Sequence, residues 1–146
     1  MKKNLVPFDE LGFRIYLVNP PAALLGDGKK ISAPNMKKLK LAAFKALAEK
    51  PSRLTGDEVH FIRKYLRMTQ VNFSRWLNMS THSTVSLWES YEKRLSGMDY
   101  NTEVLLRLQM EALLSKKANV PMKKLENLRD LSSQEKRVTL TFPASR

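Results

Sequence analysis

The polar side chains best suited to chemistry lie in a short stretch of the chain that is almost free of charge. Residues 80–86 read STHSTVS, so five hydroxyl groups and an imidazole follow one another closely. Gln70 precedes this run, and the basic residues Arg75, Lys93 and Arg94 flank it. Hydroxyl, amide and guanidinium groups form hydrogen bonds with phosphate oxygens and with base edges. These residue types indicate recognition of a ligand rather than bond cleavage.

Residues for other kinds of chemistry are sparse. The chain has no cysteine, which excludes disulfides and thiolate metal sites, and its two histidines, His60 and His82, cannot form a zinc site unaided. No glycine-rich phosphate loop, Ser/His/Asp set or carboxylate pair in apolar surroundings is present. Asp57 and Glu58 instead suit the first turn of a helix. We therefore expect a protein that is not an enzyme and that uses no cofactor and no metal.

The helix expected before the hydroxyl-rich stretch begins at Thr55. Thr55 and Glu58 have the spacing of a capping box, in which each side chain bonds the other residue's amide. Val59, Ile62 and Leu66 follow at helical spacing and predict one buried face.

Two more short helices are expected, one on each side of the turn. Thr69 is the predicted N-cap of the first, which buries Phe73, Trp76 and Leu77, and Asn78 suits a left-handed helix end. The second is expected to begin at one of Ser80, Thr81, Ser83 or Thr84 and to point Val85 and Trp88 inward. Three helices joined by such short turns must cross steeply around a shared core.

These residues resemble a known family. Met68-Thr69-Gln70, Phe73, Leu77, the 80–84 turn, Val85-Ser86 and Trp88-Glu89 together resemble the Xre-type, lambda-repressor-like helix-turn-helix regulators. Residues 54–58 and 61–66 are most similar to the DNA-binding half of MqsA-type antitoxins. The resemblance covers roughly residues 54–110. It implies a mainly α protein with a five-helix, lambda-repressor-like domain at 53–115. A small α+β segment at 1–52 precedes this domain, and a C-terminal helix and strand at 116–146, a candidate dimerisation arm, follow it.

The chain departs from the family pattern in three ways. The turn before the third helix is one residue longer than usual, and Leu87 stands where many relatives carry a polar or basic reader of bases. MqsA-type antitoxins also often carry a cysteine-ligated zinc module that engages the toxin. The segment in the equivalent position here has no cysteine, so any zinc role is lost.

The resemblance and the helical spacing together indicate which residues contact DNA. Gln70 matches the family position that touches the phosphate backbone, His82 could donate to a guanine acceptor, and Leu87 could lie against a thymine methyl group. The alternatives are that Gln70 only supports its helix start and that His82 contacts nothing. Because few Arg, Asn or Gln side chains are available to read bases, DNA shape is expected to contribute to sequence preference. The full set of DNA-contact candidates is Gln70, Arg75, Ser80, Thr81, His82, Ser83, Thr84, Ser86, Leu87, Lys93 and Arg94.

The charge of the chain also favours a polyanionic partner. The formal net charge is +12, from 26 basic and 14 acidic residues. Residues 51–110 contain eight basic and six acidic residues, whereas residues 1–50 contain ten and four, and residues 111–146 eight and four. The arms are therefore expected to supply phosphate contacts. No membrane-spanning run or signal peptide is evident, so we expect a cytoplasmic, nucleoid-associated protein without membrane contact.

Other elements follow from periodicity. Alternation predicts strands at 13–18 and 137–142, the second pairing with the first in its own chain or in a partner subunit, and Gly26-Asp27-Gly28 suits a tight turn. Helices are expected from Asn35 to Glu49, from Asn101 or Thr102 onward, and from Pro121. The predicted apolar stripe of the helix after Thr102 is Val104, Leu105, Leu108, Ala112 and Leu113.

Three functional interpretations follow from this pattern. The first is a dimeric transcriptional regulator, a repressor or autorepressor, that reads a two-fold symmetric operator and serves as the antitoxin of a toxin–antitoxin pair. The second is a protein-binding module that neutralises a toxin or other partner on a helix-turn-helix scaffold. The third is a non-specific architectural DNA-binding protein.

Overall fold

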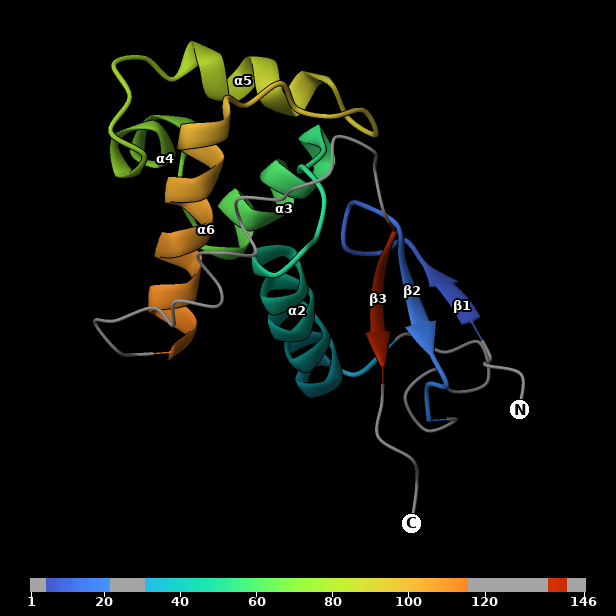
Figure 1. The fold of residues 1–146 in the computed structure, drawn as a ribbon. Coiled ribbons are helices and arrows are strands. Elements are labelled where there is room, and N and C mark those ends of the chain that lie inside the picture. Colours follow the sequence, from blue (N-terminus) through green and yellow to red (C-terminus); the bar gives the residue numbers. More distant parts are fainter. Residues whose placement is uncertain (1–4, 22–30, 116–136, 142–146) are drawn as a thin grey trace.

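The protein is mainly helical and has one small sheet (Figure 1). The computed structural model describes residues 5–21, 31–115 and 137–141. The predicted turn at 26–28 and the predicted helix from Pro121 lie outside these ranges. The elements in chain order are β1 (Leu5–Phe8), β2 (Ile15–Val18), α2 (Ala33–Ala48), α3 (Gly56–Tyr65), α4 (Gln70–Trp76), α5 (Ser83–Ser90), α6 (Tyr100–Ser115) and β3 (Val138–Thr141).

The sheet joins the two ends of the described chain. Its strand order is β1-β2-β3, with β1 antiparallel to β2 and β3 parallel to β2. Ile15 pairs with Val138 and Leu17 with Leu140, so the predicted pairing of the last strand with residues 13–18 is confirmed within one chain. Strand β1 was not predicted. Strand β2 begins only at Ile15, and Phe13, two residues earlier, packs edge-to-face on Phe61, with ring centroids 5.1 Å apart.

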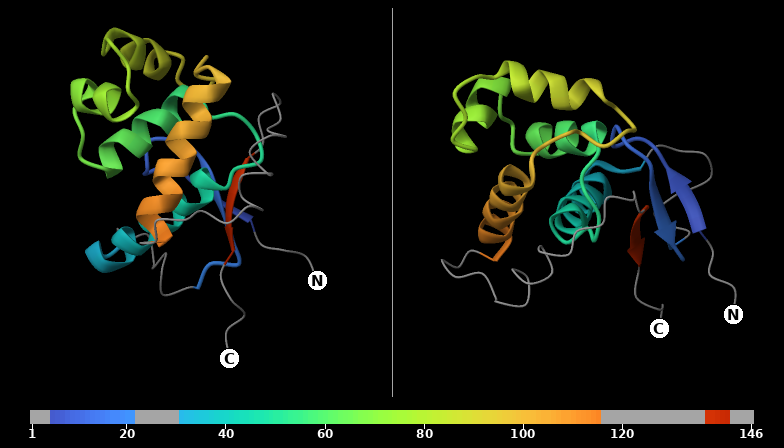
Figure 2. Two further views of the ribbon diagram at one scale, coloured as in Figure 1. Left: turned by 60° about the vertical axis from the view of Figure 1, so that its left-hand side comes forward. Right: turned by 45° about the horizontal axis from the view of Figure 1, so that its top comes forward.

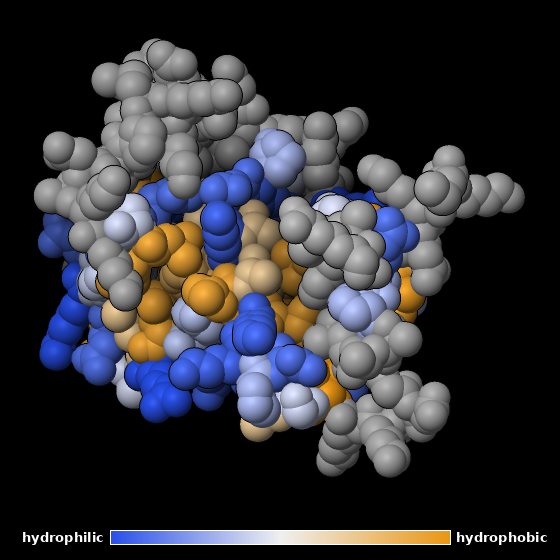
Figure 3. Space-filling model, turned by 90° about the horizontal axis from the view of Figure 1, so that it is seen from below, coloured by the Kyte–Doolittle hydropathy of each residue, from blue (hydrophilic) through white to orange (hydrophobic). Residues whose placement is uncertain are grey.

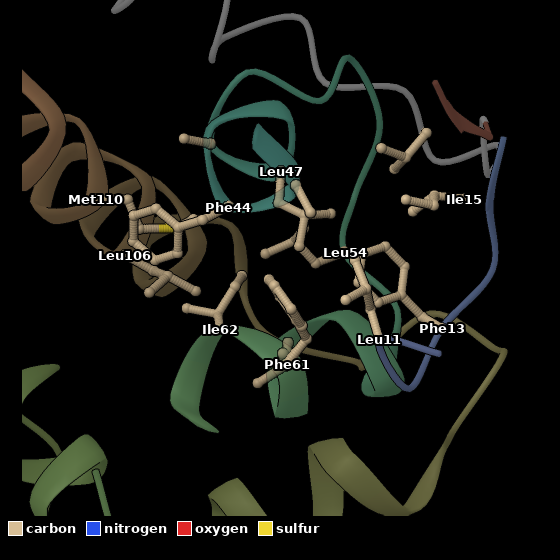
Figure 4. Packing of buried hydrophobic residues seen from close by; sticks show 14 of the residues in the cluster. Leu11, Phe13, Ile15, Phe44, Leu47, Leu54, Phe61, Ile62, Leu106 and Met110 are labelled. Atoms are coloured by element: carbon tan, nitrogen blue, oxygen red, sulfur yellow. The ribbon is translucent and has the colours of Figure 1, made fainter. Parts of the chain in front are cut away.

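One hydrophobic core connects the sheet to the helices. Helix α2 lies between the sheet and α6, with α3 across its end (Figures 1 and 2). The core draws apolar side chains from all of these elements, and burial of each large one contributes roughly 1.5–3 kcal/mol. Those labelled in Figure 4 include Ile15 from β2, Phe44 and Leu47 from α2, Phe61 and Ile62 from α3, and Leu106 and Met110 from α6.

Two helices begin earlier than predicted. Ser32, not Asn35, is the N-cap of α2, and its hydroxyl accepts the Asn35 amide. Proline is tolerated in a first helical turn, so Pro34 allows the helix to start ahead of Asn35. Asp99 likewise precedes α6, and its carboxylate accepts the Thr102 amide at 3.2 Å. The predicted caps at Asn101 or Thr102 were therefore wrong by two or three residues.

The buried face of α6 differs from the predicted stripe. Val104, Leu105, Leu108 and Ala112 are only partly buried and Leu113 is 51% exposed. The buried residues are Glu103, Leu106, Arg107, Met110 and Glu111. The buried face therefore includes charged residues, and two of them, Glu103 and Arg107, have buried partners.

Those partners lie in the segment between α2 and α3. The guanidinium of Arg107 is fully buried and donates to Glu103 at 2.8 Å and to the carbonyl oxygens of Lys50 and Ser52. Arg53 also donates to Glu103, at 3.1 Å. A buried charge is tolerated only when it is paired and hydrogen-bonded. These ion pairs and hydrogen bonds therefore hold the α2–α3 connection against α6, and substitution of one charged partner alone would leave the other buried and unpaired.

A second buried pair links the same connection to α3. The Lys50 ammonium lies 2.7 Å from one Glu58 oxygen and 2.9 Å from the other, and both side chains are almost fully buried. Glu58 also accepts the Thr55 amide. We call the five ions Lys50, Arg53, Glu58, Glu103 and Arg107 the buried network.

Candidate nucleic-acid interface

Helices α3, α4 and α5, called here the α3–α5 unit, contain the predicted site residues. The capping box of α3 is confirmed, since the Thr55 hydroxyl accepts the Glu58 amide at 3.2 Å and Glu58 accepts the Thr55 amide at 2.8 Å. The hydroxyl of Thr69 caps α4 by accepting the Asn72 amide at 3.1 Å, also as predicted. Asn78 adopts the expected left-handed conformation, with φ of 58°, just after α4 ends.

The start of α5 was predicted incorrectly. The N-cap is His82, and its side chain makes no capping hydrogen bond. Ser80 and Thr81 lie before the cap, while Ser83 and Thr84 lie inside the helix. The Thr81 hydroxyl accepts a hydrogen bond from the Ser83 amide at 3.2 Å. This amide at the start of α5 is therefore bonded by the residue that precedes the N-cap.

The two sides of α5 differ in character. Val85 and Trp88 are buried as predicted, at 0% and 3% exposure, while Ser86 is exposed and Leu87 is 55% exposed. Of the predicted DNA-contact residues, Gln70 and Thr84 are partly buried. The other nine are exposed, namely Arg75, Ser80, Thr81, His82, Ser83, Ser86, Leu87, Lys93 and Arg94.

These residues occupy one region of the fold. Gln70 opens α4, Arg75 lies in its last turn, and Lys93 and Arg94 follow the end of α5. Helix α5 lies on the opposite side of α3 from α2 (Figures 1 and 2). The exposed lysines of α2, at positions 37, 38, 40 and 45, are therefore not part of the surface that α5 presents.

One carboxylate ties the three helices of the unit together. Glu89 of α5 accepts from Arg63 of α3 at 2.6 Å (Nε to Oε2) and 2.9 Å (Nη2 to Oε1). Its Oε1 also lies 2.8 Å from His60 Nδ1 and 3.3 Å from Gln70 Nε2. We call these four residues the Glu89 cluster. The resemblance drew attention to Glu89 and Gln70, but it did not reveal that they share a hydrogen bond or that His60 and Arg63 join them.

The Glu89 cluster keeps its carboxylate ionised. Burial raises the pKa of Glu89, but the hydrogen bonds from Arg63 and His60 outweigh burial and bring the pKa below its ordinary value of 4.5. The Glu89 side chain is 9% exposed and that of Arg63 8%, so water screens this pair little.

The beginning of α3 and the end of α5 touch through backbone. The Gly56 amide donates to the Arg94 carbonyl at 3.0 Å, and the Asp57 amide donates to the Glu92 carbonyl at 2.8 Å. A Cβ on residue 56 would lie 2.4 Å from the Trp88 carbonyl oxygen, so only glycine allows this approach. Burial and the nearby Glu92 charge raise the pKa of Asp57.

A cavity of about 740 Å³ lies where the sheet meets the beginning of α3. It is lined by Tyr16, Arg137, Lys93 and Asp57, among others. Several of its charges have partners, since Arg14 pairs with Asp9 at 2.8 Å and Glu58 with Lys50. Part of the charge that lines this cavity is therefore already neutralised within the protein.

Comparison with known proteins adds no relative. No protein-family model, curated protein or solved structure matches the chain.

The part of the chain that the structure describes contains no group of three or more His, Asp or Glu side chains placed to hold a metal ion. Nor does it contain a helix long and apolar enough to cross a membrane.

Proposed function

We propose that the protein is a sequence-specific double-stranded DNA-binding transcriptional regulator. In this proposal the α3–α5 unit is a lambda-repressor-like helix-turn-helix of the Xre type, and α5 is its recognition helix. The observation that carries the proposal is the two-sided nature of α5. Val85 and Trp88 anchor it in the core, while small hydroxyl groups, His82 and Leu87 face solvent.

The dimensions and charge of this surface suit a duplex. An α-helix with its side chains is roughly 10–12 Å across, which matches the ~12 Å width of the major groove, so the exposed side of α5 could enter it. Exposed basic side chains lie in the last turns of α3 and α4 or just after α3 and α5, and they are candidates for phosphate contacts. They are Lys64, Arg67, Arg75, Lys93 and Arg94.

Base reading in this proposal relies on few strong contacts. His82 stands at the start of α5, where a recognition helix meets base edges, and Leu87 would contact a thymine methyl group. The hydroxyls of Ser83 and Ser86 discriminate weakly between bases. DNA shape and deformability therefore supply much of the preference.

The regulator is proposed to act as a dimer on a two-fold symmetric operator, with half-sites about 34 Å apart. Repression would follow from occlusion of a promoter, and an autorepressing antitoxin is the specific role that we favour. The surface offers apolar area for a second copy or a toxin. Leu41 on α2 and Leu113 on α6 are half exposed, and Figure 3 shows an apolar area bordered by hydrophilic residues.

A second candidate function is a protein-binding module built on the same scaffold. The observation that favours it is Leu87, which is 55% exposed in the middle of α5. Covering this exposed apolar side chain with a partner protein would be favourable, because association buries apolar surface away from water.

Selection from random duplex DNA, followed by titration at about 150 mM salt, separates these functions. A regulator should select a two-fold symmetric sequence and bind it ~10³-fold or more tightly than a scrambled duplex. His82→Ala should then relax specificity, whereas Gln70→Ala should weaken binding to all sequences. Equal, weak binding to every duplex that disappears as salt rises would reject the operator and leave the non-specific DNA-binding protein and the protein-binding module as the alternatives.

A further inference from the structure

The side-chain amide of Gln70 has only one orientation that satisfies its surroundings. A carboxamide has a donating end, Nε2, and an accepting end, Oε1, and its neighbours decide which way it points. An ionised carboxylate can only accept hydrogen bonds. The Glu89 oxygen that lies 3.3 Å away must therefore face Nε2, because Oε1 in its place would be repelled.

Glu89 is itself fixed in place. Both of its oxygens accept from Arg63, which also donates to the Met68 carbonyl at 3.0 Å, and His60 adds a third donor. His60 must carry its proton on Nδ1 to donate there, so the 3.4 Å approach between that nitrogen and Arg63 Nη2 is not a hydrogen bond. The carboxylate thus has a fixed position against which Gln70 is oriented.

The charge of Arg63 also makes this arrangement compatible with a phosphate. A lone carboxylate beside Gln70 would repel a phosphate, but the bidentate ion pair with Arg63 offsets its charge. Gln70 retains a second N–H group that Glu89 does not use. Because Gln70 is the first residue of α4 and is partly exposed, this group can meet a ligand outside the helix.

We propose that Glu89 is a positioning residue for DNA binding, which holds the Gln70 amide so that its second N–H donates to a phosphate oxygen. This inference rests on the proposed function. Because the amide is already fixed before DNA binds, less side-chain conformational entropy is lost when the contact forms. A contact to the phosphate backbone should strengthen binding to every DNA sequence equally.

Nuclear magnetic resonance tests the orientation without DNA. In the wild-type protein, one of the two Gln70 side-chain amide protons should be shifted downfield by its bond to Glu89. On acidification both Gln70 amide signals should move together with the Glu89 carboxyl carbon, because protonation removes the acceptor charge. This arm requires no substitution and so does not depend on the folding of a variant. Chemical shifts of the Gln70 side-chain amide that do not change when Glu89 is protonated would overturn the proposal.

A double-mutant cycle tests the use of this orientation in DNA binding. Gln70→Ala should weaken binding of the selected duplex about tenfold in the wild-type background, but less than about threefold in a Glu89→Gln background. Asn72→Ala, an exposed change on the same helix, is the control and should weaken binding about equally in both backgrounds. Equal effects of Gln70→Ala in the two backgrounds would overturn the inference but leave the proposed function intact. Failure of the wild-type protein to bind any duplex would instead reject both.

Discussion

The buried network and the Glu89 cluster are both built from ion pairs, but they differ in exposure. The buried network lies between α2, α3 and α6, and its Arg107 and Glu103 side chains are 0% and 1% exposed. The Glu89 cluster lies within the α3–α5 unit. Its Arg63 and Glu89 side chains are also nearly buried, at 8% and 9% exposure, but its His60 side chain is 46% exposed. An ion with no access to water depends fully on its partners, whereas an ion at the surface can exchange them for water. The buried network is therefore expected to contribute to stability, whereas the Glu89 cluster keeps its His60 side chain in contact with solvent.

The largest effect is expected in the buried network. Arg107→Met should lower the free energy of unfolding by roughly 3–5 kcal/mol, because Glu103 remains buried without its main partner. Chemical denaturation followed by circular dichroism measures this loss. In the double variant with Glu103→Gln the loss should be smaller than the sum of the two single losses. Additive losses would show that the pair is not coupled.

The next largest effect is expected at Gly56, where the beginning of α3 meets the end of α5. Gly56→Ala places a Cβ 2.4 Å from the Trp88 carbonyl oxygen and 2.7 Å from the Glu92 amide nitrogen, both backbone atoms. The expected destabilisation is about 2–3 kcal/mol. The control is Gly12→Ala, where a Cβ would meet no atom within 4 Å and only the positive φ of 93° is unfavourable. In thermal unfolding, the midpoint temperature of the Gly12→Ala variant should be higher than that of the Gly56→Ala variant.

A smaller effect, dependent on pH, is expected in the Glu89 cluster. Glu89→Gln should cost about 1.5–3 kcal/mol at pH 7, because charged hydrogen bonds from Arg63 and His60 are weakened. The folded-state pKa of Glu89 is below 4.5, so its contribution is fully present above that pH and is lost as the pH falls through the folded value. Stability curves of wild type and variant should converge in acid. A difference that stays constant from pH 7 down to pH 2 would contradict this role.

The smallest effect on stability is expected at the exposed surface of α5. Leu87→Ala should change the free energy of unfolding by less than about 0.5 kcal/mol, since the side chain is 55% exposed. Its functional effect separates the two candidate functions. A DNA-binding protein should lose preference for thymine at one position of the selected site, whereas a protein-binding module should lose affinity for its partner. A loss of stability above 1 kcal/mol would mean that Leu87 packs against other residues.

The sequence alone determined the features that depend on neighbours within one or two helical turns. The caps at Thr55 and Thr69, the left-handed Asn78 and the inward-facing Val85 and Trp88 were all predicted, because each depends on spacings of three or four residues. Local signals failed where several hydroxyl or amide residues compete for one helix start. Ser32 and Asp99 were therefore missed, and His82 took the cap position of α5.

Only the tertiary structure decided which charged residues are buried. Arg53 and Glu103 are 50 positions apart in the chain, and Arg63 and Glu89 are 26 apart. A local sequence pattern therefore predicts neither pair. The same limit applied to α6, whose buried face contains Glu103 and Arg107 beside Leu106 and Met110 and so differs from the predicted apolar stripe. A hydrophobic pattern records the average preference of each residue type. The burial of a charge depends instead on a partner that folding brings from elsewhere in the chain.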